Sequence, residues 1–150
     1  MTLASIAHTH GQDVALFLHV LGAMILVGGL LTCASSLAFA RGDVRFLRLG
    51  YFSLLAVALP GWLLMRIGAE WIASKEGWND KNAQTWLNIG FIIADAGGLL
   101  LLISLIAGGI GVRRLRAGKG TGLLKATLVL SVVLLGAYVV AVWAMAGKPN

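Results

Sequence analysis

Long runs of apolar residues dominate this chain, and short polar segments separate them. Four such runs cover about residues 14–40, 49–71, 87–112 and 123–146. At about 1.5 Å per helical residue, each run is long enough to cross the roughly 30 Å hydrocarbon core of a bilayer. The pattern therefore predicts an all-α fold, with a single transmembrane domain over residues 1–150 built as a four-helix bundle.

Two polar or irregular features interrupt this pattern. Pro60 lies inside the second run, where its ring removes one backbone hydrogen bond and clashes with the carbonyl of Ala56. We therefore expect a kink at this point. Residues 73–86 read ASKEGWNDKNAQTW and form the only extended polar stretch, which we expect to make a hairpin at the membrane surface.

The composition agrees with a membrane protein and argues against a soluble one. Hydrophobic residues make up 59% of the chain and charged residues 12%, with a mean hydropathy of +0.89. Soluble domains have about a quarter of their residues charged. The net charge of +6 could suggest nucleic acid, but the basic residues cluster at the ends of apolar runs. We therefore expect the lipid bilayer as partner, and no nucleic acid.

The distribution of basic residues predicts the orientation. Eight of them follow the first and third runs, and four lie on the opposite side. The eight are Arg41, Arg45, Arg48, Arg113, Arg114, Arg116, Lys119 and Lys125. Because basic residues are enriched in cytoplasmic loops, we expect a multi-pass protein of the cell membrane with both termini on the outer side. An aromatic belt then lies at the outer interface, formed by Trp71, Trp78, Trp86 and Trp143.

One polar residue in each run falls at a similar depth, about 8 to 13 Å below the outer surface by helical rise. These residues are His19, Arg66, Asp95 and Tyr138. Ionisable residues inside membranes usually face the bundle interior and find one another. We therefore predict a buried polar layer in the outer half of the bundle, in which Arg66 pairs with Asp95 and the other two complete the network. Arg66 could instead pair with Glu70, four residues on, which would leave Asp95 buried and protonated.

Several short motifs resemble a known group of proteins. The first run contains FLHVLGA at residues 17–23 and VGG at 27–29, and the later chain has PGW at 60–62, WL at 86–87 and GVRR at 111–114. Over most of its length the chain resembles a family of small bacterial four-helix integral membrane proteins of unknown function. More distantly it resembles copper-resistance D-type membrane domains and the membrane-bound protoporphyrinogen oxidases, whose members use intramembrane histidines. This chain has only His19 within a run, so one chain cannot supply a bis-histidine haem site.

The sequence contains no diagnostic catalytic motif, so we expect a non-enzymatic structural or accessory membrane protein without catalytic residues or cofactor. One alternative is a redox protein that binds haem b or copper through His19, with Met65 or a second subunit's histidine as the other ligand. Another is a small transporter in which Asp95 exchanges protons. Rows of glycine suit close helix packing, so the sequence also fits a homo-oligomer or a partner in a membrane complex.

Overall fold

The computed structural model describes the backbone of residues 3–76 and 85–147 and the side chains of residues 13–75 and 87–147. The helical elements, in chain order, are α1 (Leu3–Phe39), α2 (Val44–Ser53), η1 (Leu54–Ala58), α3 (Leu59–Glu76), α4 (Thr85–Arg116) and α5 (Gly122–Gly147). The described backbone contains no β-strand. The predicted all-α class is therefore confirmed.

Within the described residues, four helical segments are long and apolar enough to cross a membrane: Asp13–Phe39, Val44–Lys75, Leu87–Arg116 and Gly122–Gly147. The second consists of α2, η1 and α3 in continuous succession. Large apolar side chains such as Phe17, Met24 and Ile92 point outward and are exposed. Such a surface would aggregate in water, whereas the acyl chains of a bilayer match it. The structure is a four-helix transmembrane bundle.

The helices reach further into the basic segments than the sequence suggested. The predicted runs end at residue 40 and resume at 49, which leaves Arg41, Arg45 and Arg48 in a connecting loop, but α2 begins at Val44 and takes the last two into the helix. The reason is local, because the Asp43 side chain accepts a hydrogen bond of 2.8 Å from the Arg45 N–H and so caps the helix. Similarly, α4 continues to Arg116, because basic side chains in its last turn interact favourably with the negative end of the helix dipole.

A π-helical turn lies at the position where we expected the chain to kink. The η1 segment ends two residues before Pro60, and the Leu59 N–H donates to the carbonyl of Leu54, five residues back. Proline cannot donate the next hydrogen bond of a regular helix. A wider turn at this point lets the chain enter α3 while most backbone carbonyls near the proline keep hydrogen-bond partners.

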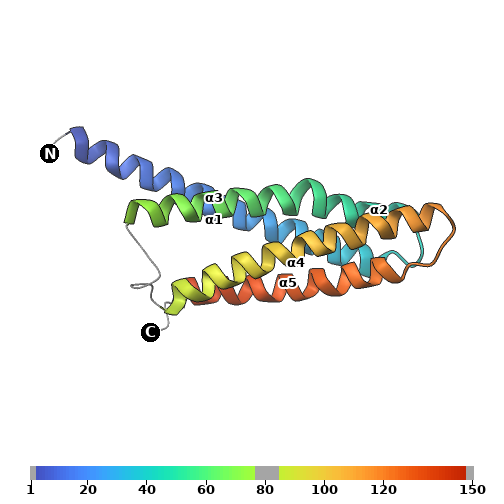
Figure 1. Cartoon of the computed structure of the whole chain (residues 1–150). Helices are drawn as coiled ribbons and strands as arrows, with labels where there is room; N and C mark the ends of the chain where they lie inside the picture. Colours follow the sequence, from blue (N-terminus) through green and yellow to red (C-terminus); the bar gives the residue numbers. More distant parts are fainter. Residues whose placement is uncertain (1–2, 77–84, 148–150) are drawn as a thin grey trace.

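The four spans associate as two pairs. As Figure 1 shows, α1 lies along α3, and α4 lies along α5. The pairs are joined mainly through α1 and α5, and α2 meets α4 near the interhelical loops. The contacts between α3 and α4 are few, and these helices diverge toward the end of the bundle where α1 begins and α5 ends. We call this the terminal end and the opposite one, where α2 begins and α4 ends, the basic end.

Glycines set the close approach of α1 and α3. A Cβ added to Gly22 would collide with the backbone nitrogen of Met65 and lie 2.8 Å from the carbonyl oxygen of Gly61. A Cβ added to Gly68 would lie 2.6 Å from the backbone nitrogen of His19. Backbone therefore packs directly on backbone, as is typical of membrane helices with small residues at their interface. This contact brings His19 beside the segment of α3 that carries Arg66.

Candidate functional site

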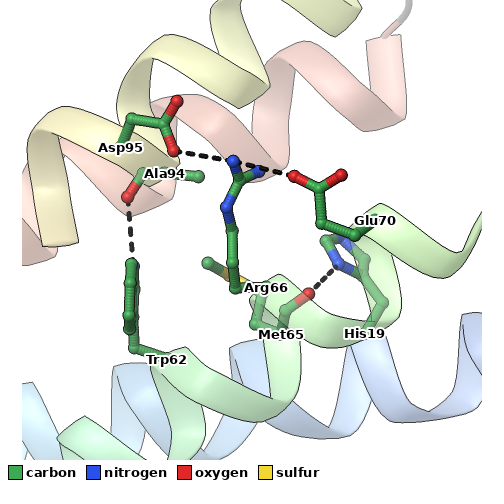
Figure 2. Close-up of polar contacts among 7 residues, drawn as sticks. All are labelled: His19, Trp62, Met65, Arg66, Glu70, Ala94 and Asp95. Carbon is green, nitrogen blue, oxygen red and sulfur yellow. Dashed lines mark hydrogen bonds and ion pairs between the residues drawn. The ribbon is translucent and has the colours of Figure 1, made fainter. Parts of the chain in front are cut away.

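Arg66 forms ion pairs with two carboxylates at once. Its Nη2 atom lies 2.8 Å from Oε1 of Glu70 on the same helix and 3.0 Å from Oδ1 of Asp95 on α4 (Figure 2). The predicted pairing of Arg66 with Asp95 is therefore confirmed. The alternative pairing with Glu70 also forms, so the two options are not exclusive. We call these three residues the Arg66 cluster.

A second contact ties the arginine to α4. The guanidinium carbon of Arg66 lies 5.4 Å from the centre of the Phe91 ring, within the range of a cation–π interaction. Phe91 is one helical turn before Asp95, so both residues present the same side of α4 to α3. The Nη1 atom of Arg66 is buried and has no hydrogen-bond partner, which leaves Nη2 to serve both carboxylates.

The prediction that this layer is buried is wrong for Asp95, its one acidic member. The side chain of Arg66 is 24% exposed, but those of Glu70 and Asp95 are 58% and 61% exposed. The neighbouring Ala94 is buried, and one residue along a helix turns the side chain by about 100°. Asp95 therefore lies at the edge of the contact between α3 and α4, where its carboxylate reaches Arg66 but stays largely exposed.

His19 lies next to the cluster but makes a separate contact. Its Nδ1 atom lies 2.9 Å from the carbonyl oxygen of Met65, as Figure 2 shows. A carbonyl oxygen only accepts, so Nδ1 carries the proton and donates it. In the neutral ring, Nε2 is then an acceptor. The prediction that His19 completes the network of Arg66 and Asp95 is not met, because its hydrogen bond holds the ring on the backbone of α3.

Tyr138 also stands apart from the predicted network. Its ring is buried against Gly97, and its hydroxyl has no hydrogen-bond partner. The carbonyl oxygen of Ala94, one turn from Gly97 on the same helix, accepts a 3.0 Å hydrogen bond from Nε1 of Trp62 instead. Sequence reasoning missed this role of Trp62. The signal was its position directly after Pro60 and Gly61, inside a span rather than at its end.

The structure does not bring together the two proposed metal ligands through their side chains. Met65 contacts His19 through its backbone carbonyl, while its thioether side chain belongs to the buried core and extends away from the imidazole in Figure 2. Among the described residues, no group of three His, Cys, Asp or Glu side chains could hold a metal ion. A haem or copper site on His19 would need a ligand from outside the side chains that the structure describes.

The predicted aromatic belt can be followed at two of its four members. Trp71 near the end of α3 and Trp143 near the end of α5 are both exposed at the terminal end of the bundle. Trp78 and the side chain of Trp86 lie outside the described residues, as does the middle of the predicted hairpin, residues 77–84. The position of the membrane surface relative to these residues stays a prediction.

The fold and the Arg66 cluster define a class of protein: a helical, multi-pass membrane protein with a charged cluster between two of its spans. Comparisons with protein-family models, with curated proteins and with solved structures find no match to this chain. The resemblances drawn from the short motifs therefore stay predictions, and the function has to be argued from the site.

Proposed function

We propose that this is a non-enzymatic structural or accessory protein of the bacterial cell membrane. In this proposal the Arg66 cluster holds the α1–α3 pair against the α4–α5 pair. The observation that supports it is the 3.0 Å ion pair between Arg66 and Asp95, which crosses between helices that otherwise touch little. The protein would act through the shape of its bundle and the partners that this shape accepts.

The physical case for such a crosslink is stronger in lipid than in water. Apolar side chains gain nothing by leaving acyl chains for one another, so packing and polar contacts carry helix association. A lone charge inside a membrane span costs about 2.5 to 3.5 kcal/mol on insertion scales. Arg66 and Asp95 each lower that cost for the other, and the cost returns if α3 and α4 separate.

The orientation in this proposal follows from charge. Eight basic residues lie at the basic end and four elsewhere, so the basic end is assigned to the cytoplasm and the terminal end to the outer side. The Arg66 cluster then lies toward the outer surface. Its exposed carboxylates are accessible to water, to lipid headgroups or to a second membrane protein.

The test compares Asp95→Asn with Glu70→Gln. Each change removes one negative charge from the same guanidinium, with little change in shape. Only Asp95 links two helices, because Glu70 lies on the same helix as Arg66. We expect the Asn variant to lose about 1 kcal/mol of stability, which is about 2 to 4 °C in unfolding temperature, and the Gln variant to lose less than half of that.

The single cysteine supplies the readout. Cys33 is fully buried, and its sulfur lies 3.3 Å from the hydroxyl oxygen of Ser131. Since that hydroxyl donates to the carbonyl oxygen of Thr127, the thiol donates to Ser131. A thiol-reactive fluorogenic dye will label Cys33 only when the bundle opens on heating. Equal unfolding temperatures for the Asn and Gln variants would refute the crosslink.

One observation favours a second candidate, a proton-coupled transporter. A single guanidinium shared by two carboxylates leaves the Arg66 cluster with a net charge of −1 when both are ionised. Binding one proton would bring the cluster to neutrality, and the exposed Asp95 can be reached from outside the bundle. In this proposal the exchange of that proton drives the movement of a solute.

This candidate is tested in vesicles that contain the purified protein and a trapped pH-sensitive dye. A panel of amino acids, sugars and metal cations is added outside, one at a time. Transport predicts a solute-dependent pH change that Asp95→Asn abolishes and that Gly28→Ala keeps, because Gly28 has open space around it. A structural protein gives no pH change with any solute, while the Asn variant still unfolds earlier.

A further inference from the structure

A groove runs between α2 and the basic-end half of α4, far from the Arg66 cluster. Its volume is about 440 Å³. From α2 it is lined by Tyr51 and Phe52, and from α4 by residues that include Ile106 and Ile110 and, at the helix end, Arg113 and Arg116. We call it the α2–α4 groove. Its lining changes from apolar to strongly basic along one direction, toward the end of α4.

Two glycines of α4 give the groove its form. A Cβ added to Gly108 would lie 2.9 Å from Cδ2 of Tyr51, and one added to Gly109 would lie 3.2 Å from the tyrosine oxygen. The Tyr51 ring therefore packs on a stretch of α4 that has no side chains. The helices touch at this point, and the space beside the ring stays open as the groove.

The apolar part of the groove is open to the outside of the bundle. Phe52, Ile106 and Ile110 line it, and each of these side chains is exposed in the bundle. No other part of the described chain covers them. Within a bilayer, such a wall is in contact with lipid acyl chains.

The basic part of the groove carries positive charge that no acidic side chain among the described residues neutralises. Arg113 and Arg116 are three residues apart on one side of α4, and neither takes part in the ion pairs of the described residues. Arg48 lies one helical turn before Phe52 on α2, on the same helical face. The only described acidic residue at this end, Asp43, caps α2. A ligand that completes the groove therefore has to be anionic.

We propose that the α2–α4 groove binds one anionic phospholipid of the surrounding membrane. Arg113 and Arg116 hold its phosphate, and one acyl chain lies along Phe52, Ile106 and Ile110. The planar guanidinium offers paired N–H donors that match phosphate oxygens. Basic pockets between membrane helices on the cytoplasmic side are a recurrent form of anionic lipid site. A free phosphate ion would fill only the basic end and leave the apolar wall empty.

The test is native mass spectrometry of the full-length protein in a mild detergent. Dioleoyl phosphatidylglycerol or dioleoyl phosphatidylcholine is added, and the population with one lipid bound is measured. The binding variant is Arg113→Gln with Arg116→Gln. The matched control is Arg114→Gln with Lys119→Gln, which removes the same charge from the same end of α4 but outside the groove lining. Cys33 labelling on heating checks that both variants keep the fold.

The proposal predicts that the wild-type protein prefers phosphatidylglycerol and that the binding variant holds it about thirtyfold more weakly, since two arginines are lost. The control variant should change affinity less than threefold. Equal binding of the two lipids would overturn the proposal, and so would equal losses in the two variants, which would indicate general surface charge. Displacement of the lipid by millimolar inorganic phosphate or glycerophosphoglycerol would also overturn it, because the site would then recognise the headgroup alone.

The lipid site and the proposed function are independent of one another. The groove lies at the basic end, and no residue of the Arg66 cluster lines it. The Asp95→Asn variant should therefore bind phosphatidylglycerol as the wild type does. Failure of either test leaves the other interpretable.

Discussion

The contact between α1 and α3 should be the part of the bundle most sensitive to a single methyl group. We expect Gly22→Ala to destabilise the protein strongly, because the added Cβ meets backbone and not a flexible side chain. Its nearest neighbours are the backbone nitrogen of Met65, the carbonyl oxygen of Gly61 and the carbonyl carbon of Leu64. None of these atoms can move without shifting the helix.

The size of the effect follows from the geometry. The last two neighbours lie 2.8 Å from the added Cβ and the Met65 nitrogen lies closer still, whereas ordinary contact begins at 3.4 Å, so α1 and α3 must separate by more than 0.6 Å there. A gap of about 0.5 to 1 Å already forfeits a quarter to a half of each dispersion contact along the interface. Overpacking of this kind costs about 1 to 3 kcal/mol, and we expect the upper end for a contact of backbone with backbone.

The assay is the heating curve of Cys33 labelling, with Gly28→Ala as the matched control. Gly28 lies on the same helix, but no atom lies within 4 Å of its added Cβ. Alanine there removes only a poor helix former, so the control should match or slightly exceed the wild type. For Gly22→Ala we expect the unfolding temperature to fall by about 6 to 12 °C.

The reasoning would be refuted if the two variants unfolded within about 2 °C of each other. That result would mean that α1 and α3 lie further apart than the structure shows. It would also remove the basis for placing His19 beside α3, because the 2.9 Å hydrogen bond from His19 to the Met65 carbonyl needs the same close approach.

Two further predictions concern polar groups near the Arg66 cluster, and they expect opposite changes in the unfolding temperature. Tyr138→Phe removes a buried hydroxyl that has no partner, so the unfolding temperature should stay unchanged or rise, since an unsatisfied buried group costs about 1 to 3 kcal/mol. Trp62→Phe removes the donor of the 3.0 Å hydrogen bond to the Ala94 carbonyl and should lose about 1 kcal/mol, measured as a fall of about 2 to 4 °C. A clear fall for the tyrosine variant, or none for the tryptophan variant, would contradict these assignments.

Depth along a helix could be predicted from the sequence, because the rise per residue is constant. Counting residues from the span ends placed Arg66 and Asp95 at one level, and the structure joins them at 3.0 Å. The four spans could also be predicted from the sequence, since a run of apolar residues is recognised without tertiary information. The helix ends were less accurate, because the cap at Asp43 extends α2 into a segment that we expected to be a loop.

The direction in which a side chain points around its helix could not be predicted in the same way, because it depends on which other helices pack beside it. The small residues beside Asp95 pack against α3 and α5, yet the carboxylate itself turns outward and stays 61% exposed. His19 and Tyr138 lie near the same level, but the packing of their helices aims one at the Met65 carbonyl and the other at Gly97.

The sequence alone determined that the chain spans a membrane four times and that one polar residue of each span lies at a similar depth. The tertiary structure decided which of these residues meet, and it alone placed the α2–α4 groove beside arginines that have no ion-pair partner among the described residues. The reason is that contacts between helices depend on rotation as well as on depth.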